Sequence, residues 1–213
     1  MRSADTLDAV TVDAAGTIVE LHDPVPSLGR ALAEHGVDRE PEAVRRAFAA
    51  EVAHYLPRSH EGRDEASLAR LRREAVAVFL DALGAEVAPE VFVPGFMAAI
   101  EFRPVEGVHD ALARLRAAGL RLACVANWDI GLRGQLERAD LDARFDAVIS
   151  SAEAGAPKPD PAPFRLALAR LGVTPERTLH VGDEPADREG ARAAGLAFAP
   201  TPVATLPTRL GIA

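Results

Sequence analysis

Apolar residues recur along the chain at two different spacings, and the change of spacing divides it into two kinds of segment. Between residues 24 and 100 they recur every three or four positions, with Gly and Pro between the runs, as is typical of amphipathic helices. This spacing predicts helices over residues 27–35, 41–55, 64–83 and 89–100. After Arg103 and Pro104, helical runs alternate with short β-rich runs.

The alternating part predicts a sheet. A first strand over residues 7–13 leads into small residues at 14–17, which predict a tight turn. Further strands are expected over residues 120–126, 146–150, 178–181 and 196–199, with helices over 108–115, 132–139, 164–171 and 187–194. Strands that alternate with helices favour a Rossmann-like, doubly wound parallel sheet covered on both faces. We therefore expect an α/β core over residues 1–19 and 104–213, with a small helical domain over 20–103 inserted into it.

Composition and charge narrow the classes of function. A formal net charge of −8 disfavours a nucleic-acid partner, because phosphate backbones need a basic face. Cys124 is the only cysteine, which excludes disulfides within the chain and favours a reducing cytoplasm. The first residues lack the apolar run of a signal peptide, and no run of about 18 apolar residues predicts a membrane span. We expect a cytoplasmic protein without membrane or nucleic-acid partners.

Four polar clusters fall at predicted strand ends or in the loops beyond them, where open parallel sheets bind ligands. They are Asp13, Asn127, Lys158, and the pair Asp183 and Asp187. Each alone has a plainer interpretation, since an Asp after a strand commonly caps a helix and a Lys between prolines is commonly a solvated loop residue. Their combination and order point instead to one shared site.

The chemistry of that combination is coherent. Three converging carboxylates repel one another unless a cation lies among them, and oxygen ligands of this kind suit Mg²⁺. Lys158 adds a compact positive charge, while Gly16 and Thr17 lie where a turn aims backbone N–H groups at phosphate oxygens. Asp13 is then placed to attack phosphorus and form an aspartyl-phosphate that water cleaves.

The order D-x-x-G-T, a strand followed by Asn, then Lys, then G-D-x-x-x-D resembles the four motifs of the haloacid dehalogenase-like hydrolase superfamily, from Asp13 to about Gly195. The resemblance implies that the helical insertion is a cap domain and that Mg²⁺ is the cofactor. It implies the following roles: Asp13 as nucleophile and metal ligand, the Ala15 carbonyl and Asp183 as metal ligands, Asp187 supporting the metal, Lys158 balancing charge, and Asn127, Gly16 and Thr17 holding substrate.

Two positions depart from the pattern of family phosphatases. Ala15 stands where a second Asp usually acts as general acid, and Ala126 where a Ser or Thr hydroxyl usually binds phosphate. The leading hypothesis is a Mg²⁺-dependent phosphatase that acts on a small phosphorylated metabolite. The alternatives are a weakly active or inactive binding or regulatory relative, and a 2-haloacid dehalogenase. Phosphonoacetaldehyde hydrolases share the Ala, but they need a second lysine, and Lys158 is the only one here.

Several other residues have two open interpretations. Asp129, or His22 with Asp23 near the start of the insertion, is a candidate replacement for the missing acid; the plainer interpretation is a helix cap and a surface hinge. His180 lies within a predicted strand, so we expect a hydrogen-bonded core residue. Cys124 is expected to be a small core hydrophobe.

Overall fold

The computed structural model describes residues 4–212. They form two compact units: one takes in the described residues up to Glu20 and from Arg103 onward, and the other is Leu21–Phe102. The sequence predicts boundaries after residues 19 and 103. Where the chain passes between the units, strands β2 (Val19–Leu21) and β3 (Phe102–Pro104) pair with each other. Within the described residues, no helix combines the length and apolar character that crossing a membrane requires.

The first unit is built on a five-stranded parallel sheet in the order β5-β4-β1-β6-β7. The strands are β1 (Ala9–Val12), β4 (Arg121–Ala126), β5 (Ala147–Ser150), β6 (Thr178–Gly182) and β7 (Ala197–Pro200). Nearly every residue of the first four strands is buried, as expected for a sheet covered on both faces. The predicted α/β class is therefore confirmed.

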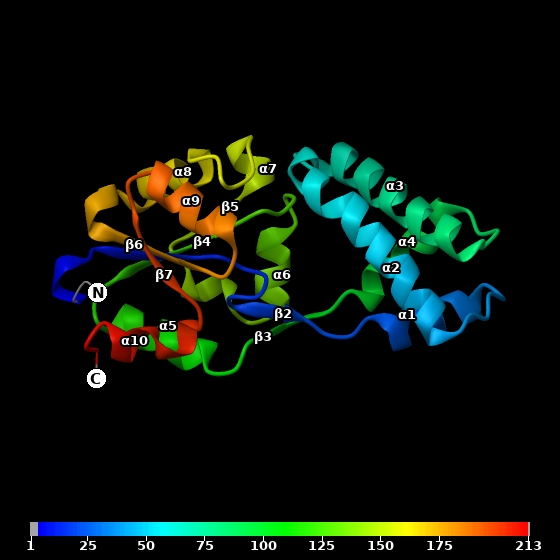
Figure 1. Ribbon diagram of the computed structural model, residues 1–213, viewed down its shortest axis with the longest axis horizontal. Helices are drawn as coiled ribbons and strands as arrows, with labels where there is room; N and C mark the ends of the chain where they lie inside the picture. The colour runs from blue at the N-terminus through cyan, green and yellow to red at the C-terminus, as the bar shows by residue number, and fades with distance from the viewer. Residues whose placement is uncertain (1–3, 213) are drawn as a thin grey trace. The chain divides into compact units, whose positions relative to one another are not determined.

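Helices cover both faces of this sheet (Figure 1). Those on one face are α5 (Val108–Ala117) and α6 (Leu132–Arg138), and those on the other are α8 (Ala162–Leu171) and α9 (Pro185–Ala193). Phe164, Ala167 and Leu171 of α8 pack with Val125 and Ile149 of the sheet in one buried cluster. The remaining short elements are α7 (Ser151–Ala154), α10 (Leu206–Arg209) and the 3₁₀ turns Ala4–Thr6, Asp142–Arg144, Pro175–Arg177 and Val203–Thr205.

The second unit contains four helices and a long 3₁₀ segment. They are α1 (Val25–Glu34), α2 (Pro41–Tyr55), η2 (Leu56–Glu61), α3 (Glu65–Leu83) and α4 (Pro89–Ala99). The boundaries follow local chemistry. Asp64 caps α3 by accepting from the Ser67 backbone N–H at 2.7 Å, and Gly84 ends the helix in the left-handed conformation at φ 57°.

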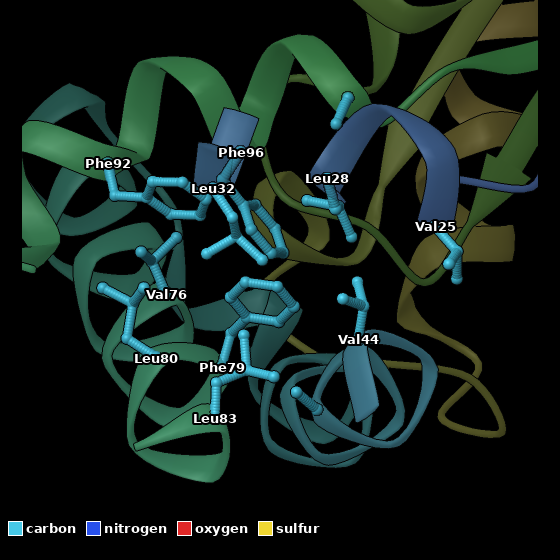
Figure 2. Packing of buried hydrophobic residues seen from close by; sticks show 12 residues of the cluster. Val25, Leu28, Leu32, Val44, Val76, Phe79, Leu80, Leu83, Phe92 and Phe96 are labelled. Carbon is cyan, nitrogen blue, oxygen red and sulfur yellow. The ribbon is translucent and has the colours of Figure 1, made fainter. Parts of the chain in front are cut away.

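Aromatic side chains fill the centre of the helical unit. The Phe79 ring lies 5.9 Å from Phe92 and 5.2 Å from Phe96, and Figure 2 shows Leu28 and Leu32 close to the same group. Burying one such side chain contributes about 1.5–3 kcal/mol, so this cluster stabilises the helical unit. 

One carboxyl group shares the apolar face of α2. Val44, Ala47 and Glu51 follow one another at helical spacing, and Glu51 is only 6% exposed. Because burial disfavours its charged form, the pKa of Glu51 is raised to about 7.

Candidate active site

The carboxyl ends of three neighbouring strands bring the predicted residues to one edge of the sheet. Asp13 follows β1 directly, Asn127 follows β4 and Asp183 follows β6. Since β1 lies between β4 and β6, these three residues start from adjacent positions. Lys158 lies in the loop between α7 and α8, and Asp187 lies in the first turn of α9.

Lys158 bridges two of the carboxylates. Its Nζ lies 2.5 Å from Asp13 Oδ1 and 2.5 Å from Asp187 Oδ1, and it also donates to the Val125 carbonyl at 3.1 Å. The lysine side chain is 4% exposed, so the ammonium is almost wholly surrounded by protein. Removing either partner from such a buried pair leaves an uncompensated charge, which is far more costly than losing a surface ion pair.

The ionisation of the three groups follows from burial and from their mutual charges. Burial raises the pKa of Asp13 to about 6, Lys158 pulls that pKa down, and Asp187 pushes it up. Burial would also raise the pKa of Asp187, but His180 and Lys158 outweigh it and hold that pKa at about 2. For Lys158, burial is outweighed by Asp13 and Asp187, which raise its pKa, so the side chain is a cation.

Asp183 completes the acidic group on its solvent-exposed side. The Thr17 hydroxyl donates to Asp183 Oδ1 at 3.2 Å. Gly16 has a φ of 74°, and a Cβ there would overlap the Asp183 carboxylate, so only glycine fits. The turn of residues 14–17 is therefore shaped around Asp183.

The donor set fits a hard divalent cation. One carboxylate oxygen from each of Asp13, Asp183 and Asp187 lies within 4.8 Å of the others. Carboxylate oxygens with room for water are the ligands that Mg²⁺ prefers. Asp187 is the most engaged of the three, because its Oδ1 accepts from Lys158 and its Oδ2 accepts from the Glu184 backbone N–H at 3.1 Å. The position of the Ala15 carbonyl as a ligand stays a prediction.

His180 belongs to the same hydrogen-bonded group, which its place in the sequence did not reveal. Its Nε2 lies 3.1 Å from Asp187 Oδ1, and its Nδ1 lies 2.9 Å from the hydroxyl of Thr11 on the neighbouring strand. Burial lowers the pKa of His180, so the ring is neutral; Nε2 then donates to Asp187, and Thr11 donates to Nδ1. The predicted hydrogen-bonded core histidine is confirmed, with a carboxylate of the site as its partner.

Two residues predicted near the substrate have other partners. Both polar atoms of the Asn127 side chain contact the backbone of Lys158. Asp129 is 2% exposed and its Oδ1 accepts from the Gly131 backbone N–H at 2.6 Å, as a turn or cap residue does. Asp23 similarly accepts from the Val25 backbone N–H, and His22 is exposed. These contacts favour the plainer interpretation of Asp129 and Asp23.

The parallel sheet, the helical insertion after β1 and the carboxylate–lysine cluster define an α/β enzyme with an acidic site at its sheet edge. A family model described as haloacid dehalogenase-like hydrolase matches residues 7–195, and the chain belongs to that family of hydrolases. The resemblance seen in the motifs is therefore confirmed.

Three known proteins show the range of its relatives. The chain is 32% identical over 203 residues to haloacid dehalogenase-like hydrolase domain-containing protein 3 of Homo sapiens, covering 88% of this chain and 78% of that protein. It is 41% identical over 97 residues to a phosphoglycolate phosphatase of Nitrosospira multiformis, covering 45% and 43%. A solved L-2-haloacid dehalogenase of Xanthobacter autotrophicus superposes with a TM-score of 0.68 at 28% identity, covering 92% of this chain and 77% of that one.

Proposed function

We propose that this hydrolase is a Mg²⁺-dependent phosphatase of small phosphorylated metabolites, with Asp13 as its nucleophile. The observation that carries the proposal is the group formed by Asp13, Asp183 and Asp187 around one point, with the Lys158 ammonium on its buried side. A phosphatase needs such a cation-binding edge because its substrate is itself an anion. The similarity to a phosphoglycolate phosphatase supports a small phosphorylated molecule as the substrate, but not a particular kind of leaving group.

Asp13, Asp183 and Asp187 would hold the cation, which when bound supplies positive charge to phosphate oxygens. Lys158 keeps Asp13 oriented and adds a second positive charge beside it. The backbone N–H groups of Gly16 and Thr17, predicted to face phosphate, donate instead to the Val19 and Ala14 carbonyls inside the turn. The proposed attraction for the phosphoryl group therefore comes from the cation and from the charge of Lys158. A carboxylate oxygen of Asp13 attacks phosphorus while the bond to the leaving oxygen breaks, giving an aspartyl-phosphate. Water then attacks that phosphorus, releasing phosphate and restoring Asp13.

The leaving oxygen needs a proton unless it departs as a stable anion. This requirement restricts the kinds of phosphate compound that can be substrates. The methyl side chain of Ala15 cannot donate this proton. General acid catalysis contributes roughly 10²–10⁴-fold, so alkyl phosphates lose that factor, whereas acyl and aryl phosphates lose little. We therefore propose substrates whose leaving group has a low pKa. The helical unit Leu21–Phe102, inserted between the motifs of Asp13 and Asn127, is proposed as the cap that selects them.

The test is turnover of acetyl phosphate and p-nitrophenyl phosphate by the full chain with Mg²⁺, compared with Asp13→Asn. The expected result is release of phosphate that EDTA abolishes and that Asp13→Asn lacks. The matched control is Asp142→Asn, which makes the same Asp-to-Asn change in a surface ion pair with Arg133. This variant should retain activity. Equal phosphate release by the wild type and Asp13→Asn would overturn the proposal.

Dehalogenation is a second candidate, supported by the 28% identity to an L-2-haloacid dehalogenase. In that chemistry Asp13 would attack carbon and displace halide, a step that needs no metal. The Asp183 and Asp187 pair argues for phosphoryl transfer, because halide displacement has no use for a cation site. Halide release from 2-chloropropionate in the presence of EDTA would favour this candidate over the phosphatase.

A further inference from the structure

Asn127 makes a two-point contact with the backbone of the loop that carries Lys158. Its Oδ1 accepts from the Lys158 backbone N–H at 2.7 Å, and its Nδ2 donates to the Lys158 carbonyl at 3.1 Å. An amide side chain used in this way supplies both hydrogen bonds that a neighbouring strand would otherwise supply. In the described part of the chain, the Lys158 backbone has no partner in a helix or a strand ladder.

Asn127 is itself held in place. It follows β4 directly, and the next residue, Trp128, is fixed by the buried Ser151 hydroxyl, which accepts from the Trp128 N–H at 3.0 Å and donates to its carbonyl at 3.1 Å. The residue two positions before Asn127, Val125, accepts from Lys158 Nζ. One strand end therefore holds both the backbone and the ammonium of the lysine.

We infer that Asn127 is a positioning residue, which acts through Lys158 and not by direct contact with substrate. The inference rests on the proposed function for its kinetic consequence, but the contact itself does not. The Lys158 ammonium lies 2.5 Å from a carboxylate oxygen of Asp13 and 2.5 Å from one of Asp187. A small shift of the Lys158 backbone therefore breaks one of these two ion pairs. A misplacement of about 1 Å at a reacting centre costs up to roughly 10²-fold in rate.

The contact is tested without turnover by hydrogen exchange at the Lys158 backbone N–H, followed by NMR. The expected result is protection in the wild type and loss of protection in Asn127→Ala. Asn127→Asp keeps the acceptor oxygen and should keep the protection, which is the conservative rescue. Unchanged protection in Asn127→Ala would overturn the inference at its first step.

The route of action is tested by a double-mutant cycle on the binding of inorganic phosphate with Mg²⁺, measured by calorimetry. Asn127→Ala should weaken phosphate binding about tenfold when Lys158 is present. This factor corresponds to the lower end of the range of free energies for one hydrogen bond to a charged group, here a contact of the displaced ammonium. In Lys158→Met the same change should have an effect below about twofold, because no ammonium is left to misplace. Equal factors in both backgrounds would mean that Asn127 touches phosphate directly, and the inference would be wrong.

Two controls keep these outcomes separate. Gln135→Ala removes another largely buried amide from the same unit, at α6, and should leave phosphate affinity unchanged within about twofold. Thermal unfolding of each variant establishes that it folds. If the wild type binds no phosphate, the proposed function fails, while the exchange at Lys158 still decides whether Asn127 holds the loop.

Discussion

Glu51 gives the sharpest prediction on stability, because it is an acidic side chain on the apolar face of a helix. Glu51→Gln keeps the size of the side chain and removes its charge. At pH 8 the charged carboxylate is held in a buried position of the folded state, whereas water solvates it in the unfolded state. We therefore expect the variant to be more stable than the wild type at this pH.

The magnitude follows from the pKa of the carboxyl group in the two states. That pKa is about 7 in the folded protein against 4.5 for the free side chain. Each pKa unit corresponds to about 1.36 kcal/mol, so the full difference in unfolding free energy is about 3 kcal/mol. A raised pKa means that stability is fully present below 4.5 and is lost as the pH rises through about 7. The gain from Glu51→Gln should therefore be below about 1 kcal/mol at pH 5 and about 3 kcal/mol at pH 8.

The assay is urea unfolding followed by far-UV circular dichroism, with wild type and variant measured at pH 5 and pH 8. Glu42→Gln is the matched control, because Glu42 lies on the same helix with its side chain 63% exposed and makes only surface ion pairs. That change should alter stability by less than about 1 kcal/mol at either pH. A gain in Glu51→Gln that is the same at both pH values, or absent at pH 8, would refute the burial argument.

Four further outcomes are expected. Ala15→Asp restores an acid and should raise kcat on alkyl phosphates by roughly 10-fold or more, with little change on aryl phosphates, as steady-state kinetics will show. Lys158→Met leaves two buried carboxylates without their cation and should lower the unfolding free energy by about 3–5 kcal/mol in urea titrations. Gly16→Ala forces the Asp183 carboxylate aside, so calorimetry should show weaker Mg²⁺ binding. Burial raises the pKa of the Cys124 thiol, so a thiol reagent should label it only after unfolding.

Most of the fold could be predicted from apolar spacing alone. The helices predicted over residues 41–55 and 64–83 correspond to α2 (Pro41–Tyr55) and α3 (Glu65–Leu83). Spacing fails where an element is too short to show a period. β2 and β3 are three residues each and are defined only by pairing with one another across some 80 residues of intervening chain, so neither was predicted.

The predicted first helix also began too late. The prediction starts at residue 27, but α1 begins at Val25, because Pro26 fits the first turn of a helix as well as it ends a preceding loop. Prolines near a boundary are compatible with both structures, and the choice depends on the packing of Val25 and Leu28 into the core.

The candidate site could be predicted as a set of residues, but not as a set of contacts. Strand ends place Asp13 and Asp183 together in any parallel sheet of this order. The contacts of Asn127 with the Lys158 backbone, and of His180 with Asp187, depend on side-chain directions that spacing does not encode. Glu51 was missed for a different reason: a glutamate on a helix is ordinarily expected to face solvent.

The pairing of β2 with β3 has a consequence for how this chain can be rebuilt. The two strands bring Leu21 and Phe102 together, so the excursion between them begins and ends at one place, as a hairpin loop does. The carboxylates of the site, Asp13, Asp183 and Asp187, lie outside that excursion, as do Lys158 and His180. Another insert with matching ends could therefore replace Leu21–Phe102, which would change part of the connection from β1 to β4 and no other connection of the parallel sheet. Evolution and protein engineering have the same route here, in which the inserted helical unit is exchanged while the residues at the edge of the sheet are kept.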